Sequence, residues 1–146
     1  MPTLVMEANV ACPPALAVER IYHYFGAHSP HQTTWRLRVP FEDLGLPNVG
    51  ELARDVLLTL EEVEQKGRIA RIPISWRVPE SNAFPVFQGF FEVRPLTDIE
   101  TNVSILGFYH PPFGVVGAAF DAVAGRKIAT ATLRHLLAEV VRAVAA

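Results

Sequence analysis

The stretch YHPPFGVVGAAFDAVAGRKIATATLRHLLAEVVRAVA, residues 109–145, decides the fold of this chain. It starts at the end of a strand-like segment, passes the double proline Pro111-Pro112 and continues with apolar residues at helical spacing from residue 115 to about residue 145. This spacing predicts a single helix of about 30 residues, roughly 45 Å long. The apolar stripe of such a helix must be covered, and the strands expected before it are the segments available to cover it.

The predicted helix changes character along its length. Its stripe consists of Ala122, Ala129, Leu133, Leu136, Leu137, Val140 and Val144. Polar residues, among them His135 and Glu139, fall on the opposite face. The large side chains lie in the second half, so we expect tight packing near the C-terminus and room for a cavity near Gly125.

The residues before this helix predict a strand, a short helix and a run of antiparallel strands. Residues 3–11 favour a strand, and Pro13-Pro14 then begins a helix with Val18, Ile21, Tyr22 and Phe25 on one face and Gly26 as its cap. Five further strands are expected at residues 35–39, 55–63, 69–78, 87–94 and 101–110. Residues 28–32, 41–50 and 79–85 are expected to form loops, and residues 65–67 a hairpin turn. Short connections between the later strands favour a meander, hence an α+β fold.

Composition restricts the class of protein. The chain has 146 residues, of which 50% are apolar and 19% charged, which predicts one folded domain over residues 1–146. A net charge of −2 without any Lys or Arg run argues against a nucleic-acid partner. Cys12 is the only cysteine, which excludes a disulfide framework and a cysteine-based zinc site.

The chain is expected to be cytoplasmic. Its first residues lack the basic and apolar regions of a signal peptide. Asp121, Arg126 and Lys127 interrupt the most apolar run, so we expect no membrane span.

The order strand, helix, meander and long helix resembles the START-like, or Bet v 1-like, superfamily (SRPBCC). The residues that carry the resemblance are Trp76, Phe84-Pro85-Val86-Phe87-Gln88-Gly89, Val93-Arg94-Pro95-Leu96, Thr101, Gly107-Phe108-Tyr109-His110-Pro111-Pro112, Gly114, Gly117, Asp121, Gly125 and Ile128-Ala129. They are most similar to bacterial members grouped with polyketide cyclase/dehydrase and lipid-transport proteins. The resemblance implies a helix-grip fold, in which a curved antiparallel sheet wraps around the C-terminal helix and encloses an apolar pocket.

The chain departs from that pattern in two ways. The second short helix has no counterpart, and six strands are predicted where the superfamily has seven, although residues 41–52 could supply another. The superfamily includes binders, transporters, receptors and cyclases, so the resemblance implies no particular reaction.

Apolar residues at alternating strand positions are candidates for the lining of a pocket. They are Trp35, Leu58, Leu60, Ile72, Ile74, Trp76, Phe87 and Phe91. Such a lining suits a hydrophobic ligand held by a few polar groups. Alternatively, these residues fill an ordinary core with no void.

Arg126 is the only charged residue in the helical row formed with Ala122, Ala129 and Leu133. If it faces a cavity, it can pair with the carboxylate or phosphate of a ligand. Alternatively, Gly125 kinks or begins the helix and turns Arg126 outward.

Tyr109 and His110, at the end of the last strand, could donate or accept a proton near a pocket, or simply lie at the surface beside a turn. Glu92 is the further ionisable candidate. No Gly-x-Ser-x-Gly motif is present, and Cys12 is expected to be a buried, inert thiol. His23, His28 and His31 have no carboxylate placed with them, so we expect neither a metal nor a cofactor.

These observations predict a protein that binds a hydrophobic or amphipathic small molecule, lipid-like or polycyclic, between a sheet and the C-terminal helix. The alternatives are an enzyme of the polyketide cyclase or aromatase kind and a protein-interaction module with a filled core. Phe90 and Phe108 are out of phase with the lining residues and could form an exposed patch for a homodimer.

Overall fold

The structure is a computed structural model. It describes the backbone of residues 3–26, 31–40, 51–77, 86–110 and 114–145, and the side chains of residues 3–26, 32–38, 55–77, 86–108 and 129–145. The elements follow in the order β1 (Thr3–Val10), α1 (Pro14–Tyr24), β2 (His31–Pro40), β3 (Glu51–Leu60), β4 (Glu64–Lys66), β5 (Ile69–Arg77), β6 (Val86–Pro95), β7 (Thr101–His110) and α2 (Gly114–Ala145). The predicted α+β class, the short helix after the first strand and the long C-terminal helix are confirmed.

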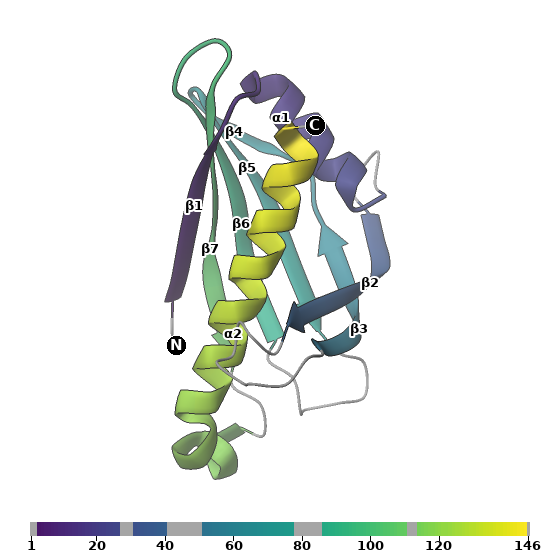
Figure 1. Ribbon diagram of the computed structural model, residues 1–146, viewed down its shortest axis with the longest axis vertical. Helices are drawn as coiled ribbons and strands as arrows, with labels where there is room; N and C mark the ends of the chain where they lie inside the picture. The colour runs from purple at the N-terminus through teal and green to yellow at the C-terminus, as the bar shows by residue number, and fades with distance from the viewer. Residues whose placement is uncertain (1–2, 27–30, 41–50, 78–85, 111–113, 146) are drawn as a thin grey trace.

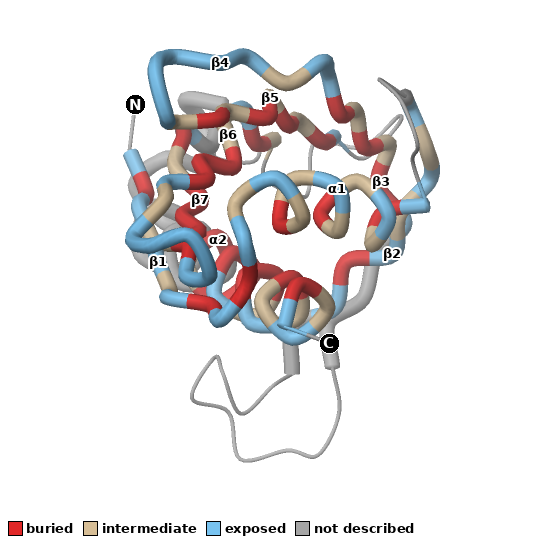
Figure 2. The backbone as a smooth tube through the Cα atoms, turned by 90° about the horizontal axis from the view of Figure 1, so that it is seen from above, coloured by how far each residue is buried: buried red, intermediate tan, exposed pale blue. Residues whose placement is uncertain are grey.

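The strands form one antiparallel sheet in the order β1-β7-β6-β5-β3-β2, with β4 paired to β5. The sheet curves around the two helices (Figures 1 and 2). Helix α2 contacts both β1 and β2, the edge strands of the sheet, and therefore closes the opening between them. This is the helix-grip arrangement.

The strands differ from the predictions mainly in β2, β3 and β4. Residues 31 and 32 belong to β2 rather than to a loop, because β2 pairs with β3 over its whole length, from His31↔Leu60 to Pro40↔Glu51. Strand β3 consequently begins at Glu51 instead of residue 55, and it ends at Leu60 instead of residue 63. Residues 65 and 66, predicted as part of a hairpin turn, belong to strand β4, and the turn lies at residues 67 and 68. The sequence does not predict β4 because its residues, Glu64 to Lys66, are all exposed and polar and show no alternation. Residues 28–30, 41–50 and 79–85, predicted as loops, lie outside the described residues.

A proline in a central strand marks the place where β5 changes partner. Strand β5 pairs with β4 through residues 69–71 and with β3 from Ile74 onward. Pro73 stands between the two ladders, and its carbonyl accepts a hydrogen bond from the Glu61 N–H at 3.0 Å. Because neither ladder requires an N–H at this point, the proline removes no strand hydrogen bond.

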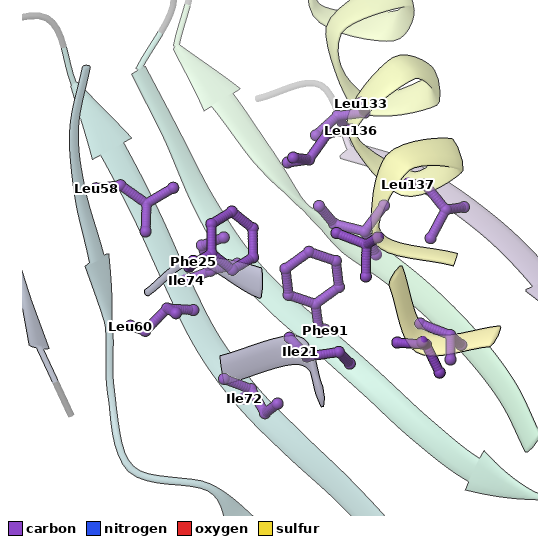
Figure 3. Close-up of a cluster of buried hydrophobic side chains, with 14 of the residues drawn as sticks. Ile21, Phe25, Leu58, Leu60, Ile72, Ile74, Phe91, Leu133, Leu136 and Leu137 are labelled. Carbon is purple, nitrogen blue, oxygen red and sulfur yellow. The ribbon is translucent and has the colours of Figure 1, made fainter. Parts of the chain in front are cut away.

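Part of the core lies where α1 meets the second half of α2. Leu133, Leu136 and Leu137 of α2 point toward the sheet beside Ile21 and Phe25 of α1 (Figure 3). The Phe25 ring lies 6.0 Å from the Phe91 ring of β6, measured between centroids. Burying each such side chain contributes about 1.5–3 kcal/mol. The tight packing predicted for this half of the helix is therefore observed.

Arg20 ties the two helices together at the same end of the molecule. Its guanidinium donates a hydrogen bond to the carbonyl oxygen of Val144 at 2.5 Å. The last carbonyls of a helix have no partner within the helix, and a cation is favourable there. Residue 144 is thereby fixed against α1.

Two glycines face each other where β6 and β7 approach most closely. Gly89 pairs with Gly107, and a Cβ built on either residue would overlap the facing strand. The Cβ of an alanine at position 89 would lie 2.8 Å from the Cα of Gly107, and at position 107 it would lie 2.6 Å from the Cα of Gly89. The obstacle is backbone, which cannot move aside as the end of a flexible side chain could, so the close approach requires glycine.

We therefore expect Gly89→Ala to lower the free energy of unfolding by at least about 2 kcal/mol, because the sheet must open to admit the methyl group. The measurement is urea-induced unfolding. The matched control is Gly67→Ala in the β4–β5 turn, where φ is 63° and nothing lies within 4 Å of an added Cβ. The control should lose only about 1 kcal/mol, from backbone strain alone. Equal losses in the two variants would contradict the close-approach explanation.

Candidate functional site

The inner face of the sheet carries one continuous apolar surface. Strand pairing aligns Leu58, Trp76 and Phe87 across β3, β5 and β6. The Trp76 and Phe87 rings are stacked, with centroids 4.5 Å apart and planes inclined by 23°. Leu58, Ile74, Trp76, Phe87 and Phe91 are each 4% exposed or less. The predicted lining residues of β3, β5 and β6 thus share one buried face.

Trp35, the remaining predicted strand residue, has the same orientation but a different environment. Trp35 belongs to the edge strand β2 and pairs with Val56 of β3. Only part of its side chain is buried. Its indole contacts the rings of Tyr24 and Phe25, at centroid distances of 5.1 Å and 5.0 Å. Trp35 therefore lies at the boundary between the inner face and the surface.

The helix contributes Ala129 and Leu133, which are both buried in the core cluster. The side chains of the other predicted site residues, Tyr109, His110, Ala122 and Arg126, lie outside the described residues. The backbone of β7 runs in register through Phe87↔Tyr109 and Val86↔His110. The part that these four residues play stays a prediction.

The two halves of α2 lie at opposite ends of the inner face. Strand β7 ends at His110 and α2 begins at Gly114, so the first half of the helix starts at the end of the sheet that holds Phe87. Val144 is held beside Arg20 at the other end. The second half of α2 therefore lies beside α1, and the helix starts at the end of the sheet where β7 ends and β6 begins (Figure 1).

Glu92 does not belong to the inner face. It alternates with Phe91 and pairs with Arg71 and Ser104 on the outer side of the sheet. Its carboxylate accepts hydrogen bonds from Arg71 Nε at 3.0 Å and from Arg94 at 2.7 Å, and its side chain is 7% exposed. Successive side chains of a strand point to opposite faces of the sheet, and Phe91 is an inner residue. The sequence of β6 therefore already indicates that the neighbouring Glu92 does not face the inner pocket.

The outer face of the sheet is hollowed across β3, β5, β6 and β7. A groove of about 490 Å³ there is lined by the apolar residues Pro73, Phe90, Leu106 and Phe108 and by polar residues that include Glu61, Glu64 and Gln88. Phe108 is 45% exposed, and the Arg71 guanidinium lies 5.5 Å from the centre of the Phe90 ring. Phe90 and Phe108 thus lie on the outer face, as their phase predicts.

A second cleft, of about 320 Å³, lies where β2 meets the two helices. Its lining residues are Tyr24, Trp35, Arg36, Arg38 and Glu139. The Tyr24 hydroxyl donates a hydrogen bond to Glu139 Oε2, and His135 Nε2 lies 2.9 Å from Glu139 Oε1. Burial and the neighbouring Glu139 carboxylate raise the pKa of Tyr24 above its ordinary value, partly offset by the charge of Arg142.

The sequence does not predict this cleft, because Glu139 and His135 fall on the polar face of the long helix, away from the predicted site residues. The signal in the sequence is their i,i+4 spacing, which brings the two side chains together on a helix. Tyr24 lies 115 residues before Glu139 in the sequence, so their contact depends on the tertiary fold.

The Cys12 thiol is 1% exposed and its Sγ lies 3.5 Å from the Pro13 carbonyl oxygen, so the buried thiol is observed as predicted. Among the side chains that the structure describes, no three His, Cys, Asp or Glu residues are grouped as metal ligands. In the same part of the chain, no helix is long and apolar enough to cross a bilayer.

No protein-family model matches the chain, and no curated protein matches it in sequence. Solved structures share its fold. They include TTHA0849 from Thermus thermophilus (TM-score 0.51, 14% identity, covering 98% of this chain and 97% of that one) and the hypothetical protein jhp0584 from Helicobacter pylori (TM-score 0.54, 12% identity, covering 99% and 86%). A norcoclaurine synthase point mutant from Thalictrum flavum, in complex with a transition-state analogue, is also similar (TM-score 0.48, 11% identity, 94% and 95% covered). At these identities the likeness extends to the fold alone.

The Tyr24–Glu139 contact predicts a pH dependence of stability. A tyrosine whose pKa is raised by folding stabilises the protein below its unfolded pKa of about 10, and this contribution is lost as the pH rises further. We expect the free energy of unfolding to fall more steeply above pH 10 in the wild type than in Tyr24→Phe, measured by urea unfolding between about pH 8 and pH 11. The pKa of Tyr22 is also raised, by burial and then by Glu62, so Tyr22→Phe is the comparison variant and should keep the slope that Tyr24 causes. An unchanged slope in Tyr24→Phe would contradict this assignment.

Proposed function

We propose that this protein binds a hydrophobic or amphipathic small molecule, lipid-like or polycyclic, between the inner face of the sheet and the first half of α2. The observation that carries the proposal is the stacked Trp76–Phe87 pair. It lies in a buried apolar surface at the end of the sheet where the helix has small residues instead of leucines. Trp76 and Phe87 are 4% and 2% exposed, so a ligand would take the place of the part of the chain that covers these rings in the free protein.

The chemistry of the inner face favours binding over proton transfer. Its described positions on the strands are apolar, apart from Thr33 and Thr101, and none is ionisable. Burying apolar ligand surface contributes about 25 cal/mol per Å², from which the cost of ordering the ligand is subtracted. The affinity would therefore follow the apolar area of the ligand.

Polar groups at the mouth of the pocket would orient the ligand. In this proposal Arg126 pairs with an acidic headgroup, and Tyr109 and His110 border the opening beside Ala122. The whole chain, residues 1–146, would be a single START-like domain, a proposal supported by the helix-grip order and by the resemblance of its motifs. Of the four ionisable candidates named for a cyclase-type enzyme, Glu92 lies on the outer face, which leaves Tyr109, His110 and Arg126.

The two tryptophans of the chain allow a direct test. In Trp35→Phe, Trp76 is the only indole and reports on the inner face. We expect the uncharged probe N-phenyl-1-naphthylamine to bind and to accept excitation energy from Trp76. The resulting probe fluorescence should saturate as the probe concentration rises. Failure of the probe to bind, or binding without transfer from Trp76, would overturn the proposed site.

Substitution of Ala129 distinguishes a pocket from a filled core. Ala129→Phe should weaken probe binding at least about ten-fold, because the ring occupies the ligand's space, and the free energy of unfolding should change by less than about 1 kcal/mol. The matched control is Ala138→Phe, at an exposed position of the same helix, which should leave binding unchanged. If the core is filled, Ala129→Phe instead lowers the free energy of unfolding by about 1–3 kcal/mol through overpacking.

A further inference from the structure

The groove on the outer face of the sheet is a candidate binding site on the side opposite to the inner-face pocket. It crosses β3, β5, β6 and β7 and reaches Thr3 of β1. Its volume of about 490 Å³ lies in the range of pockets that hold a small organic molecule. A ligand in this groove would be separated from the inner-face pocket by the sheet itself.

Strand pairing arranges the side chains of the groove in two neighbouring rows across the sheet. Residues that pair directly across antiparallel strands lie on the same face. The first row is apolar, because Pro73 pairs with Phe90 and Phe90 with Leu106. The second row is polar until it reaches β7, and it consists of Thr59, Ser75, Gln88 and Phe108. The apolar surface of the groove therefore widens toward β7, where the Phe108 side chain is 45% exposed.

Two carboxylates stand at the other end of the groove. Glu61 directly follows β3, Glu64 is the first residue of β4, and both line the groove. The backbone of Glu61 is held on both sides: its N–H donates to the Pro73 carbonyl at 3.0 Å, and its carbonyl accepts a hydrogen bond from the Tyr22 hydroxyl. Within the described part of the chain, neither carboxylate forms an ion pair or a side-chain hydrogen bond. Their oxygens are therefore open to a ligand.

The cations on this face of the sheet lie outside the groove. Among the described residues, Glu61 and Glu64 are the only charged groups in its wall. Arg71 pairs with Glu64 across the ladder, but its guanidinium is bonded to Glu92 at 3.0 Å and lies over the Phe90 ring. Lys66 follows Glu64 by two residues, which places it on the same face of β4. Because these two cations flank Glu64, we expect Glu61 to be the stronger partner of a ligand.

We propose that the outer-face groove binds an amphipathic organic cation, a flat apolar ring system that carries a protonated amine. The ammonium group donates charge-assisted hydrogen bonds to Glu61 and Glu64, and the rings lie over Leu106 and Phe108. Strands about 4.8 Å apart place β7 roughly 14 Å from β3, so the molecule should be about 10–14 Å long. An anion would face two carboxylates without a cation in the wall. The site goes beyond the inner-face pocket and does not depend on it.

Two probes with the same rings test the preference for a cation. 1-Pyrenemethylamine and 1-pyrenemethanol differ in the ammonium group, so the ratio of their dissociation constants reports on charge recognition. Both constants are measured by fluorescence titration at neutral pH and low salt. We expect the amine to bind at least about five-fold more tightly than the alcohol.

Variants at the two ends of the groove locate the bound probe. Glu61→Gln should weaken binding of the amine about three-fold and Glu64→Gln about two-fold, and neither should change binding of the alcohol. The matched control is Glu62→Gln, which removes the same charge from the next residue, outside the groove, and should change nothing. Phe108→Ser should weaken binding of both probes at least about three-fold, because the rings lose part of their apolar surface.

The proposal is overturned if the two probes bind equally, or if Glu61→Gln and Glu62→Gln have the same effect. It is also overturned if Phe108→Ser leaves both dissociation constants unchanged, because the probes then bind elsewhere, for example at the inner face. A concentration-dependent dimer in sedimentation that Phe108→Ser abolishes would make the groove an interface between two copies of the chain and would equally overturn it. Failure of the inner-face pocket would appear in a different measurement, the energy transfer from Trp76 to N-phenyl-1-naphthylamine.

Discussion

The contact of one helix with both edges of one sheet is the constraint on which the rest of this structure depends. A curved sheet leaves its inner face open between its edge strands, here β1 and β2. Helix α2 contacts both strands and buries Leu133, Leu136, Val140 and Val144 against the face between them. Without that helix, the apolar side chains on the inner face of the central strands would be exposed to water.

The same constraint divides the inner face into two ends with different properties. At one end, α1 adds Ile21 and Phe25 to the leucines of α2, and the space is filled by the protein's own side chains. At the other end, the sheet holds the stacked Trp76 and Phe87, and α2 begins at this end with a sequence rich in small residues. One end therefore provides stability, and the other is where we place the proposed ligand. Tyr24, Trp35, Arg36, Arg38 and Glu139 line a further cleft of about 320 Å³ where β2 meets the two helices.

Periodicity in the sequence was sufficient to predict the elements with a strong apolar pattern. Residues 101–110 and the long helix agree with β7 and α2, and the inner positions Leu58, Trp76 and Phe91 follow from alternation alone. The polar strand β4 and the start of β2 escaped prediction because cross-strand hydrogen bonds, and not an apolar pattern, define them. The cleft at Tyr24 and Glu139 could not be predicted, because its residues meet only after α1, β2 and α2 have assembled.

Native mass spectrometry of the protein, after incubation with a lipid extract of its expression host, tests whether a ligand binds between the sheet and α2. We expect a discrete one-to-one adduct that disappears under denaturing conditions and that Ala129→Phe fails to acquire. A protein that takes up no adduct, or an Ala129→Phe variant that takes up the same adduct to the same extent, would contradict it.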